Sequence, residues 1–153
     1  MTERLTVDQL LAAARARLEP AEAQAAVERG ALLIDTRSRE LRRETGVIPG
    51  AVHVPLSVLY WRLDSSSGHD DPELSDPSRQ VILVCAHGYS SSLAAATLRD
   101  LGFDRSTDVV GGFEAWQAAG LPVIPPAADP AEVLIVGARV LAHADGLEAG
   151  LGG

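Results

Sequence analysis

The stretch VILVCAHGYSSS (residues 81–92) combines a strand, a loop and the start of a helix. Its first four residues, 81–84, form a continuous apolar run, which is typical of a strand buried on both faces of a parallel sheet. Cys85 follows at once, and a helix is expected over residues 90–101, ended by Gly102. In an open α/β sheet, ligands bind beyond the carboxyl ends of the strands. The stretch therefore predicts an α/β fold and places the only cysteine of the chain on the ligand-binding side.

The same alternation of strands and helices continues on both sides of this stretch. Short apolar runs predict further strands over residues 31–35, 51–55 and 108–110. Capping residues, apolar side chains at helical spacing and glycine stops predict helices after Thr6, from Pro20, through Trp61 and from Phe113. Neither a helix nor a strand is predicted within the polar, arginine-rich residues 36–50. Strands that alternate with helices predict a parallel sheet covered on both faces.

The composition is that of a soluble globular domain, and it limits the partners. The chain has 153 residues, of which 46% are hydrophobic and 22% charged, which suits one domain with its own core. The formal net charge of −8 argues against general binding to nucleic acid, because phosphates would be repelled. One cysteine excludes an internal disulfide, and no apolar stretch approaches the roughly 20 residues that cross a bilayer. Since residues 1–20 also lack the apolar core of a signal peptide, the expected location is the cytoplasm.

The loop over residues 86–91 has features that favour a thiolate at Cys85. The helix that follows directs its unpaired N–H groups and the positive end of its dipole toward the loop, which favours the charged form of a thiol. Gly88 tolerates the backbone angles that let a short loop turn its amides around an anion. The residues alone leave two alternatives open: a nucleophilic cysteine, or a small buried apolar side chain.

Two further motifs flank the cysteine loop. Asp35-Thr36-Arg37 is followed by GVIPGA (46–51) and Pro55, and VVGGF (109–113) is followed by Trp116 and GLPV (120–123). In their order and spacing around Cys85, these motifs resemble those of the rhodanese-like domain family, over roughly residues 15–125. The resemblance implies a parallel five-stranded sheet flanked by helices on both faces and the activity of a rhodanese-type sulfurtransferase. It also implies that sulfur moves from thiosulfate or a low-molecular-weight persulfide, through a Cys85 persulfide, to a thiol or cyanide.

The loop and the resemblance together give a set of candidate site residues. Cys85 is the candidate nucleophile. Asp35 and Arg37 are expected to support the loop through an ion pair at the end of a strand. The histidines show no ligand spacing, so neither a metal site nor a cofactor is expected. The loop amides and rim side chains expected to bind the substrate belong to Ala86, His87, Gly88, Tyr89, Ser90, Ser91 and, as a cation at the mouth of the site, Arg62.

The resemblance covers only part of the chain. We expect an N-terminal helical extension at residues 1–14, the rhodanese-like domain at 15–125 and a C-terminal extension at 126–153. The last of these contains an apolar run, 133–141, that could cover a sheet edge or a dimer seam, so a homodimer is left open. The expected partners are a small sulfur-containing donor and a thiol acceptor, with no nucleic acid and no membrane.

Two other functions stand as alternatives. Phosphatases and arsenate reductases that share this fold need an arginine at the end of the loop to grip oxyanion oxygens, and Ser91 occupies that position. A non-catalytic rhodanese-like binding or regulatory module would keep Cys85 without using it. Many thiosulfate-using members of the family carry Arg or Lys in the loop, whereas this loop has neither, which weakens the attraction for a doubly charged donor.

Overall fold

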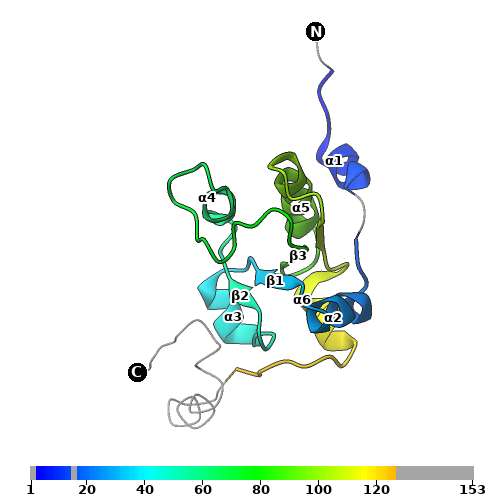
Figure 1. Ribbon diagram of the computed structural model, residues 1–153. Coiled ribbons are helices and arrows are strands. Elements are labelled where there is room, and N and C mark those ends of the chain that lie inside the picture. Colours follow the sequence, from blue (N-terminus) through cyan, green and yellow to red (C-terminus); the bar gives the residue numbers. More distant parts are fainter. Residues whose placement is uncertain (1–2, 15–16, 127–153) are drawn as a thin grey trace.

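A parallel sheet lies at the centre of the molecule in the computed structural model, which describes residues 3–14 and 17–126 (Figure 1). The strands are β1 (Leu32–Asp35), β2 (Val52–His53), β3 (Val81–Val84) and β4 (Ser106–Asp108), hydrogen-bonded in the order β2-β1-β3-β4. The helices are α1 (Val7–Ala13), α2 (Pro20–Glu28), α3 (Arg39–Thr45), α4 (Leu59–Leu63), α5 (Ser90–Asp100) and α6 (Gly112–Ala118). The predicted α/β architecture with a parallel sheet is confirmed.

The two central strands, β1 and β3, are buried along their whole length. This is the reason for their continuous apolar sequences, because both faces of a central parallel strand are covered. Their register pairs Asp35 with Val84, so Asp35 and Cys85 come at the same edge of the sheet. The order of the strands thus brings two sequence motifs together at the carboxyl ends.

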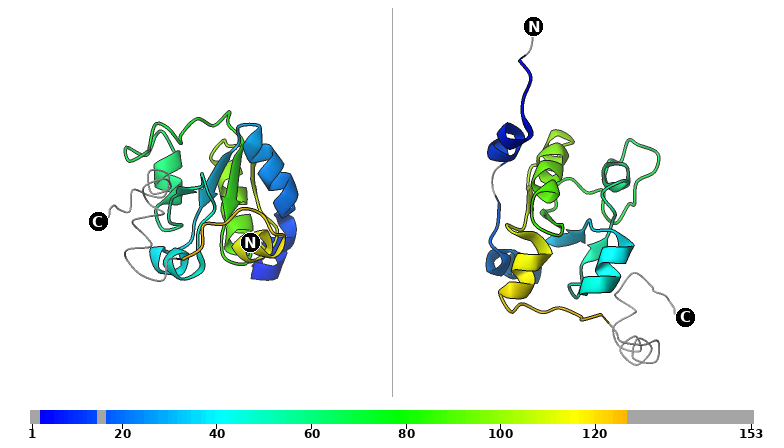
Figure 2. Two further views of the ribbon diagram at one scale, coloured as in Figure 1. Left: turned by 90° about the horizontal axis from the view of Figure 1, so that it is seen from below. Right: turned by 180° about the vertical axis from the view of Figure 1, so that it is seen from behind.

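Helices cover both faces of the sheet, as the two further views show (Figure 2). On one face, α4 and α5 pack against β1 and β3; on the other, α2 and α6 lie together. Each fully buried Leu, Ile or Phe side chain stabilises the fold by about 1.5–3 kcal/mol, so these layers fix the strand ends that carry the site. The first layer includes Leu59, Leu63, Ala94 and Leu98, and the second includes Ala23, Ala26, Phe113 and Trp116.

The helix starts follow the capping signals in the sequence. Thr6 and Gln9 form the predicted capping box, in which the Gln9 amide donates to Thr6 Oγ1 over 3.1 Å and the Thr6 amide donates to Gln9 Oε1 over 2.8 Å. Pro20 occupies the first position of α2, where its missing N–H costs nothing. Both expectations are confirmed.

The prediction of a five-stranded sheet is wrong for the part of the chain that is described, where the sheet has four strands. Leu18 occupies the edge position beside β4, but it forms only a single parallel bridge, with Val109. The extended segment ends there because Glu19 caps α2 and Pro20 begins it.

Two further elements differ from the prediction. β4 lies at Ser106–Asp108 rather than at 108–110, because the polar residues pair with β3 while Val109 continues toward Leu18. α3 was not predicted, since it contains one apolar side chain, Leu41, and shows no hydrophobic period. The side chain of Ser38 caps it by accepting from the Leu41 amide over 3.1 Å.

The two predicted extensions are described unequally. α1 lies within the N-terminal extension, whereas residues 127–153, including the apolar run 133–141, are outside the described residues. In the ranges 3–14 and 17–126, no helix is both long enough and apolar enough to cross a bilayer.

Candidate active site

Cys85 begins the loop that joins β3 to α5, and we call residues 85–91 the Cys85 loop. The residue is buried, with 6% of its surface exposed. The Phe113 amide donates to the carbonyl oxygen of Cys85 over 2.7 Å, and the Glu114 amide donates to that of Ala86 over 3.2 Å. The amides at the start of α6, which have no partner within the helix, therefore hold the first two carbonyl groups of the loop.

The sulfur of Cys85 lies against polar groups of its own loop. The Gly88 amide donates to Sγ over 3.1 Å, and the Ser91 hydroxyl oxygen lies 3.2 Å from Sγ. Burial raises the pKa of the Cys85 thiol, but the hydroxyls of Ser91 and Ser90 lower it. The amides of Ser91 and Gly88 act in the same direction, so the net pKa is lower than that of a free cysteine. The site therefore favours the thiolate more than water does for a free cysteine, although it is buried.

Glycine at position 88 is required by both the backbone angle and the space available. Its φ is +88°, and a Cβ there would meet the backbone nitrogen of Gly111 at 2.5 Å. Gly112 is similarly constrained, since its Cβ would lie 2.5 Å from the carbonyl oxygen of Cys85. The Cys85 loop and the Gly-Gly turn before α6 are thus packed backbone against backbone.

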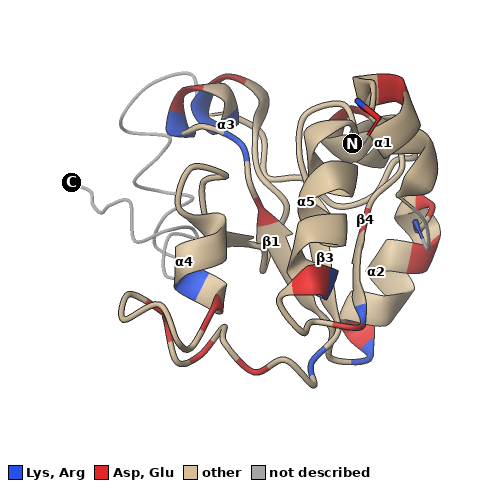
Figure 3. Ribbon diagram, turned by 90° about the horizontal axis from the view of Figure 1, so that it is seen from above, with Lys and Arg blue, Asp and Glu red and all other residues tan. Residues whose placement is uncertain are grey.

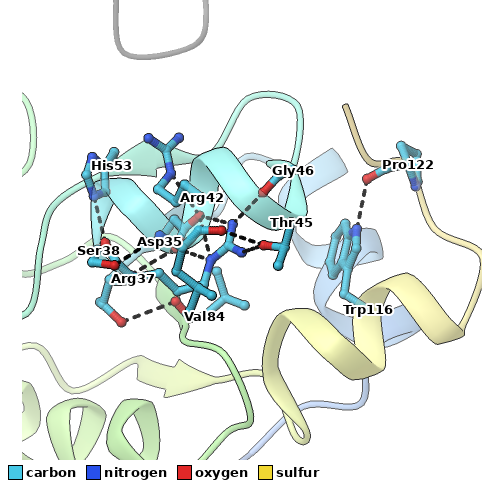
Figure 4. Close-up of polar contacts among 12 residues, drawn as sticks. Asp35, Arg37, Ser38, Arg42, Thr45, Gly46, His53, Val84, Trp116 and Pro122 are labelled. Atoms are coloured by element: carbon cyan, nitrogen blue, oxygen red, sulfur yellow. Dashed lines mark hydrogen bonds and ion pairs between the residues drawn. The ribbon is translucent and has the colours of Figure 1, made fainter. Parts of the chain in front are cut away.

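Asp35 and Arg37 form an ion pair at the end of β1, buried beside the site (Figure 4). Arg37 Nη2 lies 2.8 Å from Asp35 Oδ2, and Arg42 Nε lies 3.2 Å from the same oxygen. The Arg37 guanidinium also donates to Thr45 Oγ1 and to the Gly46 carbonyl, and it lies 3.9 Å above the Phe113 ring. Arg37 therefore ties β1 and α3 to the start of α6, the helix that anchors the Cys85 loop.

Three other predicted loop residues lie at the rim. The side chains of His87, Tyr89 and Ser90 are exposed, and Tyr89 is 67% exposed. The His87 ring lies 3.6 Å from a Glu114 carboxylate oxygen, in solvent. The groups that interact with the sulfur come from positions 88, 90 and 91, so a role of His87 and Tyr89 in binding the substrate stays a prediction.

The chain matches the rhodanese-like domain model over residues 19–119. A thiosulfate sulfurtransferase GlpE from Pseudomonas savastanoi pv. phaseolicola is 38% identical to it over 102 residues, which is 67% of this chain and 87% of the relative. The polysulfide-sulfur transferase homodimer of Wolinella succinogenes is 26% identical, with a TM-score of 0.62, over 77% of this chain and 83% of that one.

The chain belongs to the rhodanese-like domain family. The sequence-based prediction of a rhodanese-type sulfurtransferase is confirmed at this level. A Rhodopseudomonas palustris protein of unknown function, described as a possible tyrosine phosphatase, also shares the fold, with 28% identity and a TM-score of 0.72 over 80% of this chain and 97% of that one. A homodimer of this rhodanese domain stays a prediction.

The hydrogen bond that Arg62 makes is with the loop that follows α4, and its predicted role at the mouth of the site stays a prediction. Arg62 lies on α4 with its side chain exposed, and Nη1 donates to the carbonyl oxygen of His69 over 2.8 Å. This contact ties the helix to the loop that follows it. Acidic and basic residues are intermixed along α3, whereas α2 carries acidic residues only (Figure 3).

Two residues beside the Cys85 loop were missed by the sequence analysis. The Ser91 hydroxyl donates to Asp108 Oδ2 over 2.7 Å, and Arg17 Nε donates to Asp108 Oδ1 over 2.8 Å. Arg17 also donates to the carbonyl oxygen of Gly88. No local pattern marks these residues, since 91 positions separate Arg17 from Asp108. Elsewhere in the described part of the domain, no group of three or more His, Cys, Asp and Glu side chains is placed to hold a metal ion.

Proposed function

We propose that Cys85 is the nucleophile of a sulfurtransferase that carries sulfane sulfur as a Cys85 persulfide. The contact that supports this most directly is the 3.1 Å hydrogen bond from the Gly88 amide to Cys85 Sγ. A main-chain donor directed at the sulfur stabilises a thiolate and then an anionic persulfide, whereas a neutral thiol is only a weak acceptor for it.

The first half of the cycle loads the protein. The Cys85 thiolate attacks the outer sulfur of thiosulfate or of a low-molecular-weight persulfide R–S–S–H, and the sulfur–sulfur bond to the leaving group, sulfite or the thiolate R–S⁻, breaks. With thiosulfate, the sulfur–sulfur electron pair leaves with sulfite, and the negative charge of the thiolate passes to the terminal sulfur of Cys85–S–S⁻. Charge and atoms balance without an oxidant or a metal.

The second half returns the sulfur to an acceptor. A thiolate or cyanide attacks the terminal sulfur of the persulfide, the sulfur–sulfur bond of the persulfide breaks, and Cys85 leaves as a thiolate. A low pKa helps here too, because a more stable thiolate is a better leaving group. The amide of Gly88 and the hydroxyls of Ser90 and Ser91 act in both halves, since the charge stays on sulfur throughout.

Thiosulfate is our proposed donor, with low-molecular-weight persulfides as the other donor class. The relatives named thiosulfate sulfurtransferase GlpE support thiosulfate. The Cys85 loop itself has no Arg or Lys, so no cation of the loop offsets the second charge of thiosulfate, and a donor with a single charge loses less when it enters the buried site. Small thiols are the proposed acceptors in either case.

Phosphate-ester chemistry is disfavoured by the group behind Ser91. Ser91 stands where a phosphatase loop needs arginine. Its hydroxyl donates to the buried carboxylate of Asp108. A negative charge at that place opposes a phosphate dianion.

A steady-state comparison of donors tests the proposal against a non-catalytic module. Thiosulfate, 3-mercaptopyruvate and glutathione persulfide are each supplied with cyanide, and thiocyanate is measured for the wild type and for Cys85→Ser. We expect turnover with at least one donor at well above the rate of free cysteine, and none in the variant. Rates for the wild type that equal those of free cysteine with all three donors would support a binding module instead.

A further inference from the structure

Behind Ser91 lie two polar side chains, Asp108 and Arg17, that the proposed reaction does not itself use. The Ser91 hydroxyl donates to Asp108 Oδ2 over 2.7 Å. Arg17 grips the same carboxylate with two donors, Nε to Oδ1 at 2.8 Å and Nη2 to Oδ2 at 2.9 Å. The side chain of Asp108 is 1% exposed and that of Arg17 is 29% exposed. A row of polar side chains therefore runs from the sulfur, through Ser91 and Asp108, to a cation at the surface.

The backbone fixes this row in register. The Leu18 amide donates to the Asp108 carbonyl over 2.9 Å, and the Val110 amide donates to the Leu18 carbonyl over 2.8 Å. Arg17 is thereby held beside the end of β4, where its guanidinium also reaches the Gly88 carbonyl. One arginine thus binds both the carboxylate behind Ser91 and the loop residue whose amide faces the sulfur.

The direction of the hydrogen bonds gives the row a consequence for Cys85. With the Ser91 proton directed to Asp108, the Ser91 oxygen accepts from the Cys85 thiol over 3.2 Å. Once Cys85 loses its proton, Ser91 must turn its hydroxyl toward the sulfur to stabilise the thiolate. Asp108 competes for that hydroxyl, and Arg17 weakens the competition by occupying both carboxylate oxygens.

We propose that Arg17 and Asp108 are positioning residues for Cys85 that act in opposite directions. Asp108 disfavours the thiolate, because it carries a negative charge and because it holds the Ser91 hydroxyl. Arg17 offsets both effects and also binds the carbonyl of Gly88. The inference rests on the proposed role of Cys85 as the reacting group. The cation of the site is then Arg17, which lies 71 positions before Gly88, the loop residue that it binds.

The charges around the row support this assignment. Hydrogen bonding to Asp108 raises the pKa of Arg17, and the charge of Cys85 acts in the same direction, so the arginine in turn favours the thiolate. Glu19 is exposed and raises the pKa of Arg17 less than Asp108 and Cys85 do. His87 and Glu114, across the loop, are 62% and 77% exposed, so solvent screens them more than it screens Asp108.

The test measures the thiol directly and needs no sulfur donor. The rate of alkylation of Cys85 by iodoacetamide is followed against pH for the wild type, Arg17→Gln, Asp108→Asn and the double variant. Arg17→Gln should raise the pKa of Cys85 and slow alkylation at pH 7 by about 3- to 10-fold, because the buried carboxylate loses its cation. Asp108→Asn should lower the pKa, because Arg17 is left without its counter-charge and Ser91 is released. The double variant should return close to the wild type.

A purely structural role predicts a different pattern. If the pair only held the loop in shape, both single variants would loosen it and raise the pKa of Cys85 together, and that result overturns the proposal, as does no shift in either. Circular dichroism and thermal unfolding check each fold. Arg17→Lys keeps the charge but cannot bind both Asp108 oxygens and Gly88 at once, so it should slow alkylation less than Arg17→Gln does, and this comparison holds even if Asp108→Asn does not fold. Arg79→Gln removes an exposed charge elsewhere and should change nothing. If the two single variants shift the pKa of Cys85 in opposite directions but the protein accepts no sulfur, the roles of Arg17 and Asp108 hold and only the proposed function is refuted.

Discussion

Replacing Gly88 by alanine tests whether the Cys85 loop depends on close backbone packing. Gly88 has φ +88°, and a Cβ there would lie 2.5 Å from the backbone nitrogen of Gly111 and 3.1 Å from Arg17 Nη2. Gly68 is a matched control, because its φ is +82° but a Cβ there would have no neighbour within 4 Å. Comparing the two variants separates the cost of the backbone angle from the cost of the contact.

The magnitudes follow from these two positions. An alanine at left-handed angles costs about 1–2 kcal/mol, and the stiffer unfolded chain returns about 0.4–1 kcal/mol. Gly68→Ala should therefore lower the free energy of unfolding by about 0–1.5 kcal/mol. Gly88→Ala adds the cost of forcing an extra methyl group against backbone, about 1–3 kcal/mol. The displaced Gly88 amide should also weaken its hydrogen bond to the sulfur, so the pKa of Cys85 rises.

Urea unfolding of the two variants and of the wild type gives the free energies. Iodoacetamide alkylation against pH gives the effect on the thiol. Equal destabilisation by the two substitutions, together with an alkylation profile of Gly88→Ala that matches the wild type, would refute the reasoning. It would mean that the loop can shift without losing the amide at the sulfur.

Three further predictions concern the supports of the site. Arg37→Ala should lower the free energy of unfolding by about 3 kcal/mol, the lower end for breaking a buried ion pair because Arg42 still binds Asp35, whereas the exposed Arg43→Ala should stay within about 0.5 kcal/mol in urea unfolding. The pKa of Cys85 is lower in the folded state than the ordinary value of 9.0, so its stabilising contribution is complete above pH 9 and is lost as the pH falls through the folded pKa. The free energy of unfolding of the wild type, relative to Cys85→Ala, should accordingly increase with pH up to about 9, and a flat difference in chemical denaturation would count against the low pKa. Trp116→Phe should cost about 1–3 kcal/mol in thermal unfolding, since it removes the 2.9 Å bond from Nε1 to the Pro122 carbonyl and leaves a void in the core (Figure 4).

Continuous apolar runs carried most of the fold that the sequence could predict. The sequence VILV had to be a buried strand, and the residues after it had to lie at the carboxyl edge of the sheet, so Cys85 and the loop followed directly. α3 was not predicted because it is held by polar contacts, the Ser38 cap and the bond from Arg42 to Asp35, rather than by an apolar face. A hydrophobic period cannot reveal a helix of that kind.

The side chains around the sulfur were less predictable than the loop itself. Ser90, Ser91 and Gly88 are neighbours of Cys85 in sequence, so their role could be inferred from a short motif. Arg17 meets Asp108 only because the chain before α2 forms a bridge beside β4, and this depends on tertiary register. The Cys85 loop contains no cation of its own, and Arg17, which is 71 positions from Gly88 in sequence, binds the loop there.

Intact-protein mass spectrometry after brief exposure to thiosulfate or glutathione persulfide tests the role of Cys85 most directly. The predicted result is a gain of one sulfur atom by the wild type, no gain by Cys85→Ser, and loss of the added sulfur when a small thiol or cyanide follows. An unchanged mass with both donors, or an equal gain by the variant, would contradict the account.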